Sequence, residues 1–440
     1  MRKNKIILND RTGINCLFLI WTVLIFCRYG LEIGISTVII LLVAILIISF
    51  GNVKEIIAVV ICCIPLYTTF NYMIALLYGN FVLLIKFRKK IKIDLMLFIS
   101  ILIFIWELSH GFIGPFSFKE FIYFVTPYIT LLLINACDNS DIDYDYLGIM
   151  FARFVALSGI SLFYRTVSLN GGNVIHAVQN MGRLGLIDEG SFNIGGQINP
   201  NSFGIMCVLA IAILFQSYFY KSKNLKKIIF IIVLIILGAL TVSKTYIVLL
   251  VLTICLFIVT GKKQKKQLIG AVLAVIGVGS FILLRVFPTI VDTFIGRWSA
   301  EDLSTGRLSI MFESYEAIWA NPELFMFGVG IQDYSDKTQQ FVAIAPHDFI
   351  NELLMIWGIP GLIIFLALII SVVLAAKKKN KNVKLINLIP LIIIIAKSFS
   401  GHWITSGYTM LAISLAYLSL AYDFQNIHTI KESDIYREND

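Results

Sequence analysis

Repeated apolar runs of membrane-spanning length constrain the fold of this chain more than any other feature. They recur from residue 14 to residue 422, and short segments rich in Lys and Arg separate many of them. Only 14% of the residues are charged and 58% are hydrophobic, whereas about 25% are charged in a soluble domain. A soluble globular protein is therefore excluded. The pattern predicts an all-α polytopic integral membrane protein, a bundle of about 12–14 transmembrane helices.

The candidate spans are defined by length and composition, and together they predict a single transmembrane domain over residues 1–440. They cover 14–29, 35–50, 55–70, 72–86, 93–110, 119–136, 146–164, 201–219, 227–242, 245–260, 268–286, 348–374, 385–400 and 403–422. The stretch 227–260 is divided near 238–243, because only then do the lysine-rich segments on both sides of it face the same side of the membrane.

The basic clusters predict the orientation. The net charge is +9, and Lys and Arg gather at the N-terminus and in the short segments 86–92, 221–227, 262–266 and 377–381. Short loops with this bias stay in the cytoplasm, so both termini are predicted to be cytoplasmic. Nucleic acid is excluded as a partner, because the basic residues do not form one face of a folded domain.

Two segments on the external side are long. The first, about 165–200, is rich in Gly and Asn and is predicted to be irregular. The second, about 287–347, exceeds the length of an idle connection and is expected to be functional. Apolar residues at helical spacing from Leu308 to Trp319 predict an amphipathic helix in it, which ends at Asn321-Pro322. We expect this helix to lie in the membrane interface or on the bundle. The tail 423–440 is predicted to be short, cytoplasmic and disordered.

Five external cations differ in their surroundings. Arg28 and Arg165 lie at span ends, where an arginine ordinarily extends its guanidinium into the lipid headgroups. Arg183 and Arg307 lie in the long loops, and Lys244 lies in a tight turn between two apolar runs. From 285 to 347 the chain has four Lys or Arg against eight Asp or Glu, so we expect selected cations in a pocket rather than a basic surface. The planar guanidinium fork matches phosphate oxygens and suits a pyrophosphate.

His347 is the best candidate for acid–base chemistry. It directly precedes a span, beside Asp348 and about one helical turn from Glu352. An imidazole next to a carboxylate is a plausible general base near neutral pH. The alternative is a helix cap at the membrane interface. His110, His176 and His402 are interpreted as hydrogen-bonded structural residues.

Gly328 and Gly330, in the sequence FGVG, permit a positive φ or a close backbone approach. No CxxC pair, P-loop, GxSxG or HExxH motif is present, so the sequence predicts neither a metal site nor a nucleotide cofactor. An enzyme of this kind would act on a substrate that is already in the membrane.

The order of these motifs resembles the O-antigen polymerase and ligase family, most closely the Wzy-type polymerases of bacterial capsules and O-antigens. The pattern matches at Asn199-Pro200-Asn201, Ser243-Lys244, Gly306-Arg307, Gly328-x-Gly330, His347-Asp348, Glu352, and Gly358 with Gly361. Lys244 stands where the family usually has Arg, and Asp348 where it usually has Asn. The detailed likeness covers roughly 180–375.

The resemblance implies a metal-independent glycosyltransferase of the bacterial cytoplasmic membrane. The donor would be a glycan on undecaprenyl pyrophosphate, and the acceptor a new lipid-linked repeat unit. Arg307 and His347 would be the catalytic residues. Substrate would be bound by Arg183, Lys244, Asn201, Gly328, Gly330, Asp348 and Glu352. A chain-length regulator and a flippase are the implied protein partners, alongside membrane lipid.

Two alternatives remain at this point. A ligase of the same family would move a finished glycan to another acceptor, and sequence separates it poorly from a polymerase. A lipid-linked oligosaccharide flippase would also fit the number of spans. A transporter is expected to show repeated halves and charges near span centres. Here the charges lie at span ends and in loops, which favours the enzyme.

Overall fold

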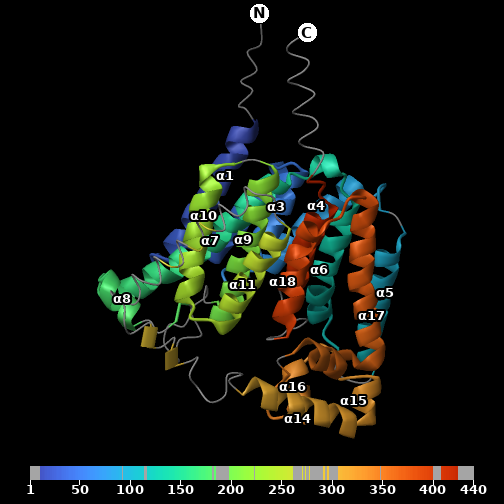
Figure 1. The fold of residues 1–440 in the computed structure, drawn as a ribbon. Coiled ribbons are helices and arrows are strands. Elements are labelled where there is room, and N and C mark those ends of the chain that lie inside the picture. Colours follow the sequence, from blue (N-terminus) through green and yellow to red (C-terminus); the bar gives the residue numbers. More distant parts are fainter. Residues whose placement is uncertain are drawn as a thin grey trace, which may run out of the picture.

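The computed structural model describes residues 10–91, 93–112, 116–180, 183–184, 198–221, 223–260, 306–346, 348–399 and 408–424, with a few single positions between 270 and 296. Every regular element in this part of the chain is helical (Figure 1). The prediction of an all-α polytopic membrane protein is confirmed. Most of the predicted span 268–286 lies outside the described residues, and so does His347.

Most helices of the bundle follow the predicted runs to within a few residues, but the predicted span 55–70 is wrong at its end, because the helix there stops at Cys62 and turns follow. They are α1 (Asp10–Tyr29), α2 (Thr37–Phe50), α3 (Val53–Cys62), α4 (Tyr72–Phe87), α5 (Leu95–His110), α6 (Phe118–Ala136), α7 (Tyr144–Leu169), α9 (Pro200–Tyr220), α10 (Leu225–Leu240), α11 (Lys244–Val259), α17 (Phe349–Lys379), α18 (Leu385–Ser398) and α19 (Thr409–Ala421). Within the described residues, α1, α7, α9 and α17 are long and apolar enough to cross a membrane, and six of the others are shorter apolar helices of 10–17 residues.

Lysines gather at one end of the bundle, which we call the lysine end. There Lys221 Nζ lies 2.6 Å from an Asp143 oxygen, and the buried Lys227 lies 2.5 Å from Asp145. Lys379, in the last turn of α17, donates a 2.6 Å hydrogen bond to the carbonyl of Cys137 at the end of α6. The opposite end, which we call the loop end, carries the short helices of the second long loop (Figure 1). The described basic segments at 86–91, 221–227 and 377–381 thus share one end, as the orientation argument requires.

The division of 227–260 into two helices is confirmed. α10 ends at Leu240 and α11 begins at Lys244, with the Ser243 hydroxyl accepting a hydrogen bond from the Tyr246 amide at 3.3 Å. The ring of Tyr246 lies so close to Gly238 that a Cβ there would meet it at 2.2 Å. The two helices therefore pack directly on each other beside the turn.

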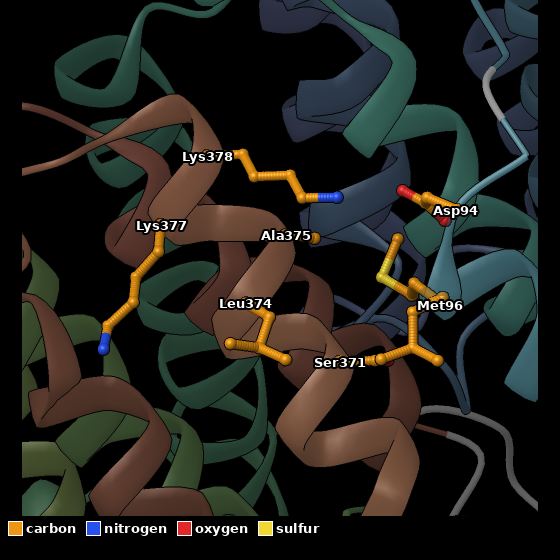
Figure 2. A pocket seen from close by; sticks show the side chains of 8 residues that line it. Asp94, Met96, Ser371, Leu374, Ala375, Lys377 and Lys378 are labelled. Atoms are coloured by element: carbon orange, nitrogen blue, oxygen red, sulfur yellow. The ribbon is translucent and has the colours of Figure 1, made fainter.

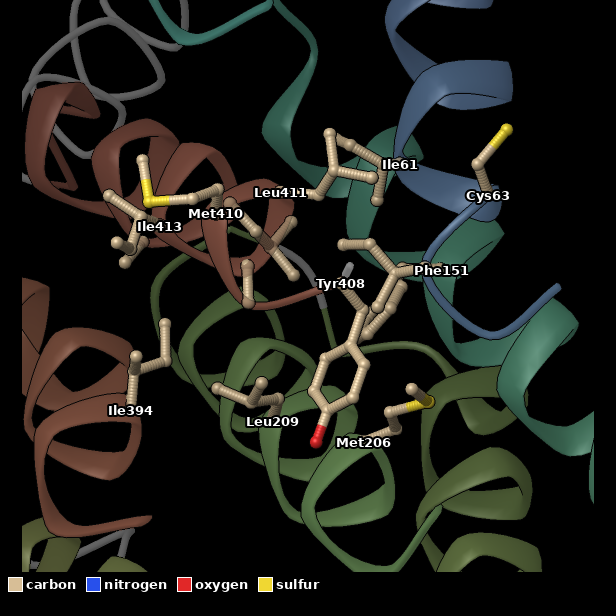
Figure 3. Close-up of a cluster of buried hydrophobic side chains, with 14 of the residues drawn as sticks. Ile61, Cys63, Phe151, Met206, Leu209, Ile394, Tyr408, Met410, Leu411 and Ile413 are labelled. Atoms are coloured by element: carbon tan, nitrogen blue, oxygen red, sulfur yellow. The ribbon is translucent and has the colours of Figure 1, made fainter. Parts of the chain in front are cut away.

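The core lies where α9 is surrounded by other helices. α9 packs on α7, α10, α11 and α18 and is apolar on all sides, as expected of a central helix. Figure 3 shows side chains from α3, α7, α9, α18 and α19 meeting here, among them Phe151 and Leu411. At the other end of α19, Phe424 is also buried and packs against Tyr144 and Tyr422, so the first residues after α19 join the core.

The first long loop is more regular than predicted. α7 continues to Leu169, and α8 (Val174–Asn180) follows after a short turn. Asn173 stabilises the start of α8, because its Oδ1 accepts hydrogen bonds from the amides of Ile175 and His176 at 3.0 and 3.1 Å. The prediction of irregular structure is therefore wrong for 165–169 and 174–180, which are helical, and holds for the turn between them.

The prediction that Arg165 extends into the headgroups is also wrong. Its side chain is 2% exposed, and Nε lies 2.6 Å from Oε1 of Glu32 in the turn after α1. The two residues are far apart in sequence, so an ion pair between them could not be recognised from the span end alone. Arg28, by contrast, donates to the carbonyl of Ile35 within the same turn.

The second long loop contains α14 (Arg307–Ala320), α15 (Pro322–Met326) and α16 (Tyr334–Thr338). The amphipathic helix and its end at Asn321 are confirmed. Its apolar face divides, however: Ile318 is buried against the protein, whereas Phe312, Tyr315 and Trp319 are more than half exposed. The side chain of Asn351 on α17 donates a 2.9 Å hydrogen bond to the carbonyl of Met311 and holds α14 against α17.

Candidate functional site

The turn between α10 and α11 meets the start of α9 at the loop end, and polar side chains join the two. Asn199 caps α9, with its Oδ1 accepting from the amide of Asn201 at 2.9 Å. This fixes the first turn of α9 and directs Asn201 at the neighbouring turn. The Oδ1 of Asn201 accepts from the Ser243 hydroxyl at 2.8 Å and from Nη2 of Arg183 at 3.0 Å.

Arg183 is held at two points. Its Nη2 donates to Asn201, and its Nε donates a 3.0 Å hydrogen bond to the carbonyl of Thr241. The amide of the next residue, Leu184, donates a 2.8 Å hydrogen bond to the carbonyl of Leu240. We call Arg183, Asn201, Thr241, Ser243 and Lys244 the arginine cluster. The structure thus brings together three of the residues that the sequence predicted to bind substrate, Arg183, Asn201 and Lys244.

The arginine cluster is electropositive for two reasons. Two of its five members, Arg183 and Lys244, are cations. In addition, α9 and α11 both begin here, and a helix N-terminus carries unpaired amides and a partial positive charge. Preorganised donors and cations of this kind favour an anionic group such as a phosphate.

Two further residues adjoin the cluster that the sequence did not select. Tyr408 donates a 3.1 Å hydrogen bond to the hydroxyl of Ser202, the neighbour of Asn201. In Figure 3 the Tyr408 hydroxyl lies on the α9 side of the hydrophobic cluster. Lys397 is 3% exposed, with Nζ 5.4 Å from the centre of the Tyr408 ring and 3.5 Å from the Thr409 hydroxyl. The sequence signal was only a lysine in the last turn of an apolar helix, which is common at helix ends.

A second group lies at the start of α17. Asp348 caps this helix, with Oδ1 accepting from the Asn351 amide at 3.0 Å, so the cap interpretation holds for Asp348. Asp348 is 8% exposed and Glu352 is fully buried. Burial raises the pKa of the Asp348 carboxyl, although hydrogen bonds from Asn351 partly offset this. Burial, and then the Glu352 and Asp348 carboxylates, raise the pKa of Tyr334 on α16.

Gly328 and Gly330 lie against α17 rather than in an open loop. The amides of Val329 and Gly330 donate 2.8 Å hydrogen bonds to the carbonyls of Met355 and Ile356. Gly328 has a φ of 74°, and a Cβ there would lie 2.4 Å from the carbonyl carbon of Ile356. The predicted close backbone approach is confirmed. Their predicted contact with substrate stays a prediction.

Arg307 begins α14 and lies on the same helical face as Ser314 and Ile318, which are buried. That face packs towards α17, so Arg307 belongs with the second group rather than with the exposed aromatic residues. Both groups lie at the loop end of the bundle (Figure 1). His347 directly precedes Asp348 in the chain but lies outside the described residues.

A cavity of about 320 Å³ opens at the lysine end, between the start of α5 and the end of α17. Figure 2 shows Lys378 extending towards Asp94 across it, while Lys377 points away. None of the predicted site residues lines this cavity. It is therefore separate from the candidate site at the loop end.

Residues 228–366 match the model of a protein family described as O-antigen ligase. The matched stretch includes Lys244, Arg307 and Glu352, whereas Arg183 and Asn201 precede it. No curated protein matches the chain. The family match confirms the resemblance to the O-antigen polymerase and ligase family, and it supports a membrane enzyme that processes glycans.

Proposed function

We propose, from the O-antigen ligase domain at 228–366 and the arginine cluster beside it, that this chain polymerises lipid-linked oligosaccharides. The donor is a growing glycan on undecaprenyl pyrophosphate, and the acceptor is a lipid-linked repeat unit. The product is O-antigen or capsular polysaccharide, made at the outer face of the bacterial cytoplasmic membrane. Both termini face the cytoplasm, in keeping with the lysine end.

One observation carries this proposal: the guanidinium of Arg183 is fixed by Asn201 and Thr241 beside Lys244, at the meeting point of two helix N-termini. Arginine forms charge-assisted, bidentate hydrogen bonds with phosphate oxygens. A cation whose direction is fixed before substrate arrives needs little reorganisation during the reaction. The arrangement suits a pyrophosphate that gains negative charge as it leaves.

The chemistry is a glycosyl transfer. A hydroxyl oxygen of the acceptor sugar attacks the anomeric carbon of the donor, and the bond from that carbon to the pyrophosphate oxygen breaks. Undecaprenyl pyrophosphate leaves with the electron pair, and Arg183, Lys244 and Arg307 offset its charge. His347 takes the hydroxyl proton, a step that typically contributes about 10²–10⁴-fold. Asp348 is the next residue in the chain and Glu352 follows about one helical turn later, so we expect these carboxylates to orient His347.

A ligase is the second candidate, because the matching family model bears that description. The two activities share the pyrophosphate-linked donor and differ in the acceptor. A polymerase joins a further repeat unit, whereas a ligase moves the whole glycan to a different lipid or protein. The arginine cluster serves either reaction, so the acceptor decides between them.

The experiment supplies purified protein in vesicles with lipid-linked repeat units and resolves the products by length. A ladder of chain lengths supports the polymerase. Single transfer to an added foreign acceptor, without a ladder, replaces it with the ligase. Movement of the labelled lipid between leaflets without any transfer overturns the enzyme and indicates a flippase. Arg307→Ala and His347→Ala should abolish extension while the protein still inserts into the membrane.

A further inference from the structure

α17 breaks at Gly358, whose backbone has φ 64° and ψ −168°. The break interrupts the helical hydrogen bonds of the preceding carbonyls. Pro360 adds to it, because proline has no amide hydrogen to donate to the carbonyl four residues earlier, that of Ile356. In a membrane protein such carbonyls need other donors, since lipid supplies none.

Each of three consecutive carbonyls at the break has a donor from elsewhere in the chain. Met355 and Ile356 accept 2.8 Å hydrogen bonds from the segment 327–331, which we call the strap. Trp357 accepts from the indole nitrogen of Trp106 on α5 at 3.0 Å. The strap and α5 therefore complete the backbone hydrogen bonding that α17 lacks at this point.

Glu107, also on α5, contacts both the strap and the broken helix α17. We call the place where the strap, α5 and α17 meet the strap junction. Its side chain is fully buried. Its oxygens accept from the amide of Ile331 in the strap at 3.1 and 3.2 Å, and Oε2 accepts from the indole nitrogen of Trp357 on α17 at 2.6 Å. One carboxylate thus binds both the strap and the broken helix.

The neighbouring groups strengthen the same junction. One turn along α5, Nε2 of His110 lies 2.8 Å from the carbonyl of Phe327, at the other end of the strap. Lys337 donates a 3.1 Å hydrogen bond to the carbonyl of Val329. The positions of these two groups explain how a carboxylate is accommodated in so buried a site.

We propose that Glu107 is a positioning residue for the transfer reaction. It fixes the break at Gly358, and through it the first two turns of α17, which carry Asp348 and Glu352. Because α14 also packs on these turns, the orientation of Arg307 depends on the same junction. A displacement of reacting groups by about 1 Å can cost about 10²-fold in rate. The inference rests on the proposed function for its rate measurement only.

The rate test compares Glu107→Ala with Glu107→Gln, and uses Glu120→Ala, which removes an exposed carboxylate from α6 near the same end, as the matched control. In Glu107→Ala, kcat for chain extension should fall about 10-fold or more with KM nearly unchanged. Glu107→Gln keeps an oxygen that can accept from Trp357 and should retain most of kcat. Equal kcat in Glu107→Ala and the control would overturn the proposal, and so would a Gln variant as slow as the Ala variant.

A second readout does not depend on activity. Hydrogen exchange of the peptide covering 327–331 should speed up about 10-fold or more in Glu107→Ala, because the Ile331 amide loses its acceptor. Exchange in Glu107→Gln and Glu120→Ala should match the wild type. If the wild type extends no glycan, the proposed function fails while this measurement still tests the junction. Unchanged exchange in Glu107→Ala would overturn the junction itself.

Trp357→Phe serves where Glu107→Ala does not yield folded protein. This change removes the donor from α17 and leaves the Ile331 contact in place. It should lower kcat with the strap still protected from exchange. A wild-type kcat in Trp357→Phe would mean that Glu107 does not act through α17.

Discussion

The arginine cluster and the strap junction lie at the same end of the bundle but are built in opposite ways. In the cluster, side chains hold a cation: one oxygen of Asn201 accepts from both Arg183 and Ser243. In the junction, backbone meets backbone, and Gly328 leaves no room for a side chain against Ile356. The first arrangement presents charge to a ligand, whereas the second sets the shape of a broken helix.

This difference separates two kinds of failure. Substitutions in the arginine cluster should reduce activity in a protein that remains folded. Substitutions in the strap junction should reduce the stability of the folded protein first. Three predictions follow this division, in order of decreasing effect, and a fourth tests the cap of α17 at Asp348.

Gly328→Ala should have the largest effect, and it should be on stability. A left-handed conformation costs an alanine about 1–2 kcal/mol. The new Cβ would meet the carbonyl carbon of Ile356 at 2.4 Å, and overpacking of this kind typically costs about 1–3 kcal/mol. Thermal unfolding of the purified protein in detergent measures the loss. Gly34→Ala is the control, since nothing lies within 4 Å of a Cβ there. Equal melting temperatures for the two variants would refute the close contact.

Arg183→Ala should lower kcat/KM for chain extension by about 10²-fold, the typical loss on removal of one preorganised stabilising donor. Arg183→Lys keeps the charge but lacks the planar guanidinium that donates to both Thr241 and Asn201. Its activity should therefore be intermediate. Both variants should unfold at the wild-type temperature. A ladder assay on the three proteins measures the effect, and full activity of Arg183→Ala would remove the cluster from the site.

Asn201→Ala should lower kcat/KM by about 10-fold, because a hydrogen bond to a charged group is worth about 1.5–3 kcal/mol. Arg183 would keep its bond to the carbonyl of Thr241 and so would remain partly oriented. The same ladder assay measures it. The double variant that carries both Asn201→Ala and Arg183→Ala should be no slower than the Arg183→Ala variant alone. Additive losses would show that Asn201 acts on something other than Arg183.

Asp348→Asn should have the smallest effect, a change in how the stability of the folded protein depends on pH. Asn is also a good helix cap, so the start of α17 should persist. Burial raises the pKa of Asp348 above its ordinary value of 3.8, so the folded state holds this proton more readily than the unfolded state. In the wild type, Asp348 therefore reduces stability as pH rises from about 4 through its folded pKa, and the Asn variant should lack this contribution. Melting temperatures at a series of pH values test it, and parallel curves for the two proteins would contradict it.

Much of the fold could be predicted from the sequence. Span positions agree with the helices to within a few residues at most ends, and the divisions at 238–243 and at Asn321 are correct. These features depend on the local chain: on the length of an apolar run, on a turn and on a cap. Local signals failed where a contact with a distant segment decided the outcome. Arg165 pairs with Glu32, and the apolar face of α14 is divided by its contact with α17.

The candidate site was predicted in part for the same reason. Arg183, Asn201 and Lys244 were selected from separate motifs, and their meeting in one cluster depends on the packing of α9 against α10 and α11. Lys397 was not selected, because its place beside Tyr408 depends on the contact between α18 and α19. Glu107 gave no signal at all, since a single acidic residue in an apolar run does not reveal its partners.

The sequence by itself determined that this protein is a helical membrane protein, and it predicted that the lysine-rich segments share one side. That follows because burial in a bilayer is decided by the apolar length of each run and by the charges beside it. Only the tertiary structure decided which polar groups meet. The acceptors at the break in α17 and the donors on α5 and the strap come from distant parts of the chain. Only the packing of the helices brings Glu107 to Trp357 and Asn201 to Arg183.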